Sequence, residues 1–315
     1  MHQSNNALAP RNSDRGQGNK PGDGDGPGDT RPYLCIPYWE FSRFTGDHVD
    51  IGQLRPLPSD VVSWECPGIH TTPYTPGKEL EVTVDVRNSG GGSAAAIATV
   101  IVYWANPTVG FANPLFFGVA TVAAPTMRDP LTPGVASVTL RGTIPATAPD
   151  HVCLLACVTH SLDAATTVID PIGDRHWAQR NLFAVSANMN RIVVPFIVAN
   201  PLEKEEVFEL KARQLDRRQL ELLSLRMKGE PGEMALRMRL VDGLGKAVTE
   251  PSRESITRLA LGPRRQRRYS LALDFEKTVH SPQIVAVELT LTYNADGART
   301  VGSLGIVISG LVDDG

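Results

Sequence analysis

Residues 76–104, PGKELEVTVDVRNSGGGSAAAIATVIVYW, decide the fold. Apolar and polar residues alternate in the first half, and the apolar set is Leu80, Val82, Val84 and Val86. This period of two predicts a strand with one buried face. Residues 88–93, NSGGGS, permit positive φ and end the strand. Residues 98–104, ATVIVYW, are β-branched and aromatic, so a second strand follows and the pair predicts half of a β-sandwich.

Length and composition limit the class of protein. The chain has 315 residues, enough for two domains at the usual size of about 150 residues, and 42% of its residues are hydrophobic. Its formal net charge of −3 lacks the strong basic excess of a nucleic-acid binder, so we expect no nucleic acid as partner. No apolar run reaches the ~20 residues of a membrane span.

The N-terminal residues predict a disordered arm. Residues 1–32 are rich in Gly, Pro, Asp and Asn and have little to bury. They also lack an apolar core of a Sec signal peptide, so a cytoplasmic location or export by a non-classical route is expected. Two interpretations of the arm stay open, a solvated tail and a segment that orders on a neighbouring subunit.

An aromatic leader follows in residues 33–75. Its cluster comprises Tyr33, Tyr38, Trp39, Phe41 and Phe44. Such a cluster either covers the edge of the next domain, which we favour, or forms a platform on which carbohydrate stacks. VVSW at 61–64 is the candidate first strand. If the platform interpretation holds, the aromatic surface candidates for binding are Tyr33, Tyr38, Trp39, Phe111 and Phe116.

The first domain continues through residue 202 as a series of short strands. Residues 151–161, HVCLLACVTHS, are apolar almost throughout, which predicts a central strand. Further strands are expected after the proline-rich loop at 105–114, over 135–140 and near 181–185. About seven short strands with Pro/Gly turns and no convincing helix favour an immunoglobulin-like sandwich.

Four sequence patches occur in order and carry a resemblance. They are PGKELEVTVDVRNSGGGSA, VIVYWANPTVGF, HVCLLACVTH and DRHWAQRNL. Together they resemble a bacterial immunoglobulin-like module of the CARDB type, a cell-adhesion-related domain, over about residues 60–187. The resemblance implies an immunoglobulin-like fold, but such modules are attached to many different proteins, so it does not specify a function.

Residues 203–315 predict a second β-sandwich. VFELKARQL alternates strictly, and short apolar runs follow at regular intervals. Pro231-Gly232 and Asp242-Gly243 predict turns, and Asp296-Gly297 predicts a hairpin. ELLSLRM is interpreted as a strand, with one short helix over DRRQLELLSLRM as the alternative. The resulting architecture is all-β, with two immunoglobulin-like or fibronectin-like sandwiches in tandem and domains at 1–32, 33–202 and 203–315.

Candidate metal ligands gather in one region without a recognised motif. They are Asp150, His151, His160, Asp163, Asp170, Asp174 and His176. Zinc and calcium sites need closer ligand spacing than these loops show, so no metal is expected and the side chains are interpreted as turn caps. No cofactor is expected either.

Catalytic motifs are also missing from the sequence. There is no GxSxG or SxxK, and the Gly90–Gly92 turn lacks the Lys-Ser/Thr of a P-loop. Cys153 and His151 would share a strand face, but a thiol in CLLAC is interpreted as core. Cys153 and Cys157 are expected to be buried free thiols, whereas pairing of Cys35 with Cys66 stays open.

One basic run, PRRQRR at 263–268, could bind phosphate or nucleic acid, or form a solvated turn before a strand; we favour the turn. The sequence therefore predicts a non-catalytic structural or binding protein that acts through surface contacts in a larger assembly with a protein partner or sibling subunits. The alternatives are a glycan or cell-surface binding module and an accessory domain of an enzyme.

Overall fold

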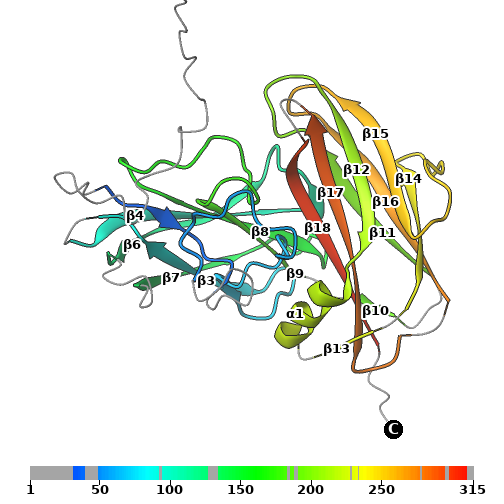
Figure 1. Cartoon of the computed structure of the whole chain (residues 1–315), viewed down its shortest axis with the longest axis horizontal. Helices are drawn as coiled ribbons and strands as arrows, with labels where there is room; N and C mark the ends of the chain where they lie inside the picture. Colours follow the sequence, from blue (N-terminus) through cyan, green and yellow to red (C-terminus); the bar gives the residue numbers. More distant parts are fainter. Residues whose placement is uncertain are drawn as a thin grey trace, which may run out of the picture.

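The computed structural model describes residues 31–39, 49–91, 94–126, 134–182, 185–187, 191–227, 229–232, 234–276, 279–294 and 298–310. Within these ranges the fold is all-β apart from one helix, and the strands form two sandwiches that lie side by side (Figure 1). The all-β prediction is therefore confirmed. Residues 1–30 of the predicted arm, together with Phe41 and Phe44, lie outside the described residues.

Two facing sheets form the first sandwich. One sheet contains β1 (Leu34–Cys35), β2 (Ile69–Thr71), β3 (Glu79–Asn88) and β7 (Val135–Thr143). The other runs in the order β6-β4-β8-β9, with bounds Leu115–Ala124, Ala96–Ala105, Val152–Thr159 and Trp177–Leu182. β3 and β4 correspond to the two strands of the 76–104 stretch, and they lie in opposite sheets. Val84, Val102 and Leu154 have no exposed surface, which confirms the predicted core between these sheets.

The glycine-rich turn after β3 is needed for a close approach of two chain segments. A Cβ on Gly90 would lie 2.3 Å from the carbonyl oxygen of Arg31, because the leader crosses the turn there. The φ of Gly90 lies outside the left-handed region, so at this position the glycine provides space and the predicted positive φ is not used. The amide of Ser89 also donates to the carbonyl of Tyr33 at 3.0 Å, which fixes the leader on the turn.

The predicted strand VVSW is wrong. Residues 61–64 form turns, and Asn181 of β9 donates its amide to the carbonyl of Trp64 at 2.9 Å. Glu65 then makes a single antiparallel bridge with Arg180. This segment covers the edge of β9 over a few residues. It gives hydrogen-bond partners to backbone groups at that edge without forming a regular strand.

The second sandwich also has two sheets. The first has the order β14-β16-β11-β5, with bounds Leu236–Asp242, Gln266–Phe275, Arg191–Ala199 and Thr108–Val109. The second has the order β10-β18-β17-β12-β15, with bounds Val185–Ala187, Ala298–Gly310, Gln283–Asn294, Glu206–Gln214 and Glu254–Leu261, and β13 (Glu230–Pro231) pairs with β17. β17 and β18 are antiparallel neighbours, as the hairpin prediction requires, although residues 295–297 lie outside the described part.

Strand pairing places β11 with the second sandwich. β11 pairs with β16 over its whole length, whereas the predicted boundary near residue 202 put it in the first domain. Its inward side chains Val194, Phe196 and Val198 are buried in the core of the second sandwich. Apart from β5, which pairs with β11, the strands up to β9 pair within the first sandwich and the strands from β10 onward pair within the second.

Two local predictions in the second half need correction. Arg217–Met227 forms α1, where the sequence was interpreted as a strand. Asp216 caps the helix by accepting from the amide of Gln219 at 2.8 Å, while the Gln219 side chain accepts from the amide of Asp216 at 3.3 Å. This reciprocal pair is a capping box, a signal present in the sequence D-x-x-Q. Pro231 lies in β13, whereas the turn at Asp242-Gly243 is confirmed by the bond from Gly245 N to Asp242 O.

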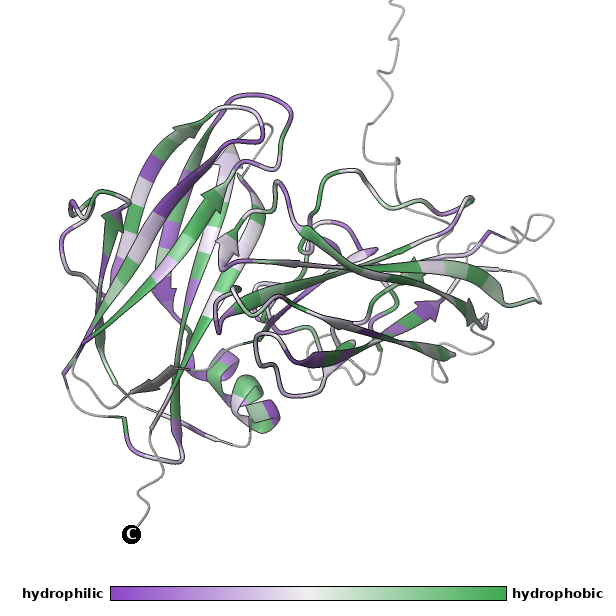
Figure 2. Ribbon diagram, turned by 180° about the vertical axis from the view of Figure 1, so that it is seen from behind, coloured by the Kyte–Doolittle hydropathy of each residue, from purple (hydrophilic) through white to green (hydrophobic). Residues whose placement is uncertain are grey.

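β8 is buried on both of its faces. Val152, Leu154, Ala156 and Val158 belong to the core of the first sandwich. Cys153, Leu155 and Cys157, on the opposite face, belong to the same apolar cluster as the second sandwich. Figure 2 shows hydrophobic and hydrophilic residues along the strands of both sandwiches.

Polar bonds complete the contact between the sandwiches. The side chains of Gln179 and Asn181 donate to the backbone carbonyls of Ser303 (2.9 Å) and Gly305 (3.1 Å) in β18. The Trp64 ring lies against Gly305, where a Cβ would come within 2.0 Å of it. The two sandwiches therefore share an apolar core and a fixed hydrogen-bonded seam.

Candidate functional site

An apolar surface without any charge lies on the outer face of the β6-β4-β8-β9 sheet. We call it the open face and define it as Ile97, Ile101, Tyr103, Phe116 and Val119. Ile97, Phe116 and Val119 are 63%, 60% and 56% exposed. β4 and β6 contain no charged residue, since their sequences are AIATVIVYWA and LFFGVATVAA. Exposed apolar patches of this kind on soluble proteins mark interaction sites or aggregation liabilities.

Strand alternation explains why these side chains are outside. In β4, Ala98, Val100 and Val102 point into the first core, so the residues between them point outward. The register pairs Ile101 with Val119 and Tyr103 with Phe116, with a bulge between Val102 and Tyr103. Both strands therefore contribute apolar side chains to one continuous outer surface.

An aromatic row connects the open face with the seam between the sandwiches. Phe116 meets Tyr103 edge to face, with ring centroids 6.3 Å apart. Tyr103 in turn lies 6.1 Å from Trp177, which is 6% exposed and belongs to the second core. The open face is thus the uncovered continuation of a surface on which the second sandwich already packs.

The chemistry of the open face is limited to apolar contact. Partial burial raises the pKa of Tyr103, and its hydroxyl stays protonated near neutral pH. The remaining side chains of the face have neither donor nor acceptor. Full burial of a large apolar side chain contributes about 1.5–3 kcal/mol, so a partner that covers Ile97, Phe116 and Val119 gains several kcal/mol.

The structure places the predicted binding aromatics mostly in the interior. Tyr33, Tyr38, Trp39 and Phe111 are between 1% and 6% exposed, and only Phe116 of the five is exposed. The assumption that these four lie at the surface is therefore wrong. The sequence could not separate them from Phe116 because aromatic residues serve equally in a cover and in a platform.

The leader aromatics cover the first sandwich, which is the interpretation that the sequence favoured. The Tyr38 hydroxyl donates to the carbonyl of Ser63 at 2.8 Å and accepts from the amide of Gln179 at 3.2 Å. The guanidinium of Arg175 lies over the Tyr33 ring, 3.8 Å from its centroid. These contacts leave no aromatic surface for a ligand at these positions.

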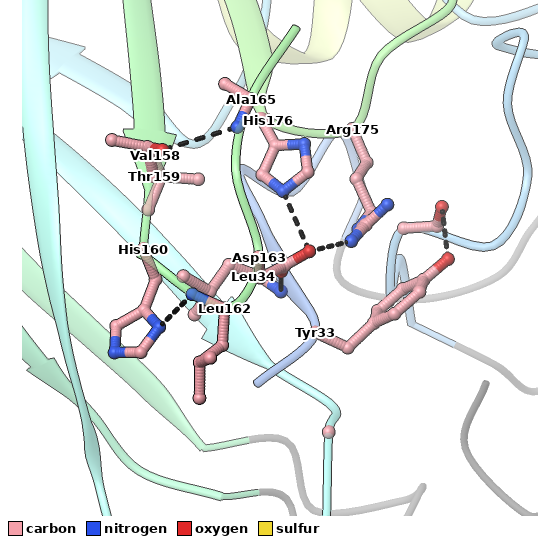
Figure 3. Close-up of polar contacts among 12 residues, drawn as sticks. Tyr33, Leu34, Val158, Thr159, His160, Leu162, Asp163, Ala165, Arg175 and His176 are labelled. Atoms are coloured by element: carbon pink, nitrogen blue, oxygen red, sulfur yellow. Dashed lines mark hydrogen bonds and ion pairs between the residues drawn. The ribbon is translucent and has the colours of Figure 1, made fainter. Parts of the chain in front are cut away.

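A buried polar cluster joins β1 to the loop before β9 (Figure 3). Asp163 accepts from the amide of Leu34 at 2.6 Å and pairs with the guanidinium of Arg175. His176 lies between two carboxylates, with Nε2 3.2 Å from Asp163 and Nδ1 2.7 Å from Asp174. Asp174 also accepts from the Thr166 amide and hydroxyl. The cluster therefore locks the leader onto the loop.

The pKa directions in this cluster indicate a charged network. Burial alone lowers the pKa of His176, but hydrogen bonds to Asp163 and Asp174 outweigh it and raise the pKa above 6.5. Burial raises the pKa of Asp174, yet the bonds from His176 and Thr166 hold it well below its ordinary value. His176 and Arg175 thus balance two carboxylates, which is the condition under which buried charges are tolerated.

The other candidate metal ligands are separate from this cluster. Asp170 accepts from Arg299 at 2.6 Å, and His160 accepts at Nδ1 from the Leu162 amide at 3.1 Å. His151 is buried, and burial lowers its pKa to about 3. In the described part of the chain no three His, Cys, Asp or Glu side chains form a group that could hold a metal.

The four cysteines are free and buried. Cys35 and Cys66, whose pairing the sequence left open, are not bonded to each other, and their thiols point to the carbonyls of Asp50 and Pro37. Burial raises the pKa of Cys153 to about 12. A nucleophilic cysteine needs a lowered pKa, so Cys153 and His151 do not form an activated dyad.

A cleft of about 980 Å³ lies between the two sandwiches. Four of its lining residues are arginines, and each already has a carboxylate partner. The pairs are Arg55–Asp50, Arg175–Asp163, Arg213–Glu288 and Arg299–Asp170. The cleft therefore has its charges satisfied internally and shows no preference for an ionic ligand.

Comparison with known proteins gives limited information. No protein-family model matches the chain, and no curated protein matches its sequence. Among solved structures it is similar to a CARDB domain from Pyrococcus furiosus in complex with di-metal ions, at 17% identity over 37% of this chain and 84% of that one, with a TM-score of 0.26. This is the domain type that the sequence patches resemble.

Two adhesins are also among the similar structures. The collagen adhesin of S. aureus is 8% identical over 79% of this chain and 93% of its own, with a TM-score of 0.23. A tip adhesin from Pseudomonas aeruginosa is 12% identical over 76% of this chain and 92% of its own, with a TM-score of 0.21. At these values the likenesses carry no argument about a ligand, and the immunoglobulin-like architecture rests on the strand pairing. The described residues include no helix that could cross a membrane.

Proposed function

We propose that the chain is a non-catalytic binding protein that attaches to an apolar surface of a protein partner through the open face. One observation carries the proposal: Ile97, Phe116 and Val119, each more than half exposed, lie on the outer face of two paired strands that contain no charged residue. Leaving such a surface in water is unfavourable, and covering it is favourable.

The nature of the partner follows from how this surface is already used. Beyond Tyr103, the second sandwich covers the same sheet face. The residues that it covers there are Leu155, Cys157 and Trp177. A partner that continues this packing needs an apolar surface of its own and no charge complementarity. A folded protein domain offers such a surface.

Glycan binding, the alternative from the sequence, fits this face less well. Phe116 and Tyr103 are inclined by 79°, so they do not form one flat platform for successive sugar rings. The outer face of β4 and β6 offers only the hydroxyls of Tyr103, Thr99 and Thr121, and it has none of the amide or charged side chains that also fix the orientation of small polar ligands. A glycan array on the wild type and on Phe116→Ala separates the alternatives, because stacking on Phe116 requires a signal that the variant loses.

The proposal is tested by placing a charge on the open face. Val119→Lys should abolish co-purification of the partner from cells that produce the chain naturally and leave the melting temperature unchanged. Thr143→Lys, at an exposed position of β7 on the other sheet, is the matched control and should retain the partner. A photo-crosslinking residue at 119 should give an adduct, and the same residue at 143 should not.

Equal co-purification by Val119→Lys and wild type would contradict the use of this face. A crosslink from 143 and none from 119 would also contradict it and would place the contact on the opposite sheet.

A further inference from the structure

A second surface, on the outside of the second sandwich, has the opposite chemistry. Four arginines and one aspartate point outward from three neighbouring strands, and we call this the arginine face. Its members are Arg191 of β11, Arg237 and Arg239 of β14, and Arg268 and Asp274 of β16. Leu236, Met238 and Leu240 are fully buried between the β14 arginines, which fixes the outward direction of the latter.

The register brings Asp274, Arg191, Arg237 and Arg239 close together. Asp274 is the β-sheet neighbour of Arg191 on one side and of Arg237 on the other. The next outward row contains Arg239 beside Ala272. Arg268 lies two positions further along the outer face of β16, beside Ile197. The face therefore has four positive charges and one negative charge, a net of +3.

Most of these arginines have no carboxylate partner. Arg191 lies 3.5 Å from Asp274, but among the described residues Arg237, Arg239 and Arg268 form no ion pair. The Nε of Arg239 is covered and has no hydrogen-bond acceptor. Ten arginines elsewhere are paired with carboxylates, whereas among the described residues Arg253, Arg265 and Arg267 form no ion pair. The ten are Arg55, Arg141, Arg175, Arg180, Arg213, Arg217, Arg218, Arg258, Arg264 and Arg299.

Unpaired like charges on neighbouring strand positions repel one another. An anionic partner removes this repulsion and supplies acceptors to the guanidinium groups. The arginines of the basic run at 263–268 have different surroundings. Arg264 pairs with Glu203 in the turn, whereas Arg268 lies on β16 and belongs to the arginine face.

The chain contains a segment with the matching pattern. Residues 21–30, PGDGDGPGDT, have three aspartates and no basic residue. In an extended peptide, Asp23 and Asp25 would be about 6.8 Å apart on one side, because each residue advances the chain by about 3.4 Å. Arg237 and Arg239 have the same spacing along β14, for the same reason.

We propose that residues 21–30 of one copy bind to the arginine face of a second copy. The segment is followed closely by Leu34, whose strand β1 lies in the first sandwich, while β14 and β16 lie on the far side of the second sandwich (Figure 1). A short link of a few residues cannot cross this distance easily within one molecule. The contact joins two different surfaces, so repetition builds a chain or a ring of copies.

The first experiment measures the peptide alone. A fluorescent peptide of residues 21–30 should bind the full chain in about 50 mM salt and lose most of its affinity in about 500 mM salt, because screening weakens exposed ion pairs. Arg237→Gln together with Arg239→Gln should reduce affinity about tenfold or more. Arg258→Gln is the matched control, since Arg258 is an exposed arginine of the same sandwich on the opposite sheet, paired with Glu209, and it should bind as wild type.

The second experiment measures assembly by sedimentation velocity. The full chain should associate with rising concentration at low salt, and the Arg237→Gln, Arg239→Gln double variant should not. A chain that lacks residues 1–30 should fail to associate and still bind the peptide, because its arginine face is intact. This combination distinguishes loss of the ligand from loss of the receptor surface.

Three outcomes would overturn the proposal. The first is no peptide binding up to millimolar concentration, and the second is equal binding by the double variant. The third is binding of a short DNA duplex to the face while the peptide does not bind, since this would assign the arginines to phosphate recognition. The arginine face belongs to the second sandwich and the open face to the first, so peptide binding does not depend on the proposed use of the open face.

Discussion

One sheet face behaves differently at its two ends. At β8 and β9, the outward residues Cys153, Leu155 and Trp177 are buried under the second sandwich. At β4 and β6, the outward residues Phe116 and Val119 are exposed. Both ends are apolar and uncharged at these positions, so their difference comes from what lies above them. An apolar outer face is therefore covered at one end by the second sandwich of the same chain and left exposed at the other.

The largest loss in stability should come from the end of this sheet face at β8 and β9, which the second sandwich covers. Leu155→Ala removes a fully buried side chain from the core that the two sandwiches share, and we expect a loss of about 2–5 kcal/mol in the free energy of unfolding. Denaturant titration measures it. Leu154→Ala, on the opposite face of β8 in the first core, should cost a similar amount. A loss below about 1 kcal/mol for Leu155→Ala would mean that the contact between the sandwiches does not contribute to stability.

A smaller effect is expected at the hydrogen-bonded seam. Gly305→Ala places a Cβ about 2.0 Å from the Trp64 ring, so strand or ring must move, and overpacking of this kind costs about 1–3 kcal/mol. Trp64→Leu replaces the ring by a smaller side chain. The double variant Gly305→Ala, Trp64→Leu should therefore lose less free energy of unfolding than the two single variants lose together. Strict additivity of the two changes would show that the ring and the glycine are not in contact.

A pH dependence should report on the polar cluster beside the covered end. The pKa of His176 is raised in the folded state above its ordinary value of 6.5. The contribution of His176 to the free energy of unfolding is therefore complete below pH 6.5 and is lost as the pH rises through the pKa of the folded state. The free energy of unfolding should accordingly fall as pH increases above 6.5. In His176→Gln this decline should be reduced. Chemical denaturation at a series of pH values between 6 and 9 measures it, and identical slopes for variant and wild type would disprove the assignment.

The smallest effect should come from the exposed end of the sheet face at β4 and β6. Val119→Ala removes apolar atoms that are already more than half exposed, and we expect a change within about 0.5 kcal/mol. The same thermal or denaturant measurement used for Leu155→Ala gives the direct contrast. A loss comparable to that of Leu155→Ala would show that the open face is covered in solution, for example by another copy of the chain.

Several elements were predictable because their signals are local. Strict alternation identified β3 and β12, the uninterrupted apolar run identified β8 as central, and the Asp242-Gly243 turn bounded β14. The capping box before α1 was also present in the sequence, although the apolar residues around it were interpreted as a strand. A period of two or a capping pair depends only on residues close in the chain, so it can be recognised without the fold.

Other features depend on residues that are far apart in the chain, and only the tertiary structure decided them. Tyr38 is buried because it bonds to Gln179, 141 positions away, and β11 belongs to the second sandwich because it pairs with β16. The same applies to both surfaces. Phe116 is exposed and Trp177 is covered because of where the second sandwich lies, and Arg237 and Arg191 both lie beside Asp274 because β16 pairs with β14 and β11. The sequence by itself determined the strands with strict alternation or uninterrupted apolar runs and which of their sides is apolar, whereas long-range packing decided which of those sides is covered.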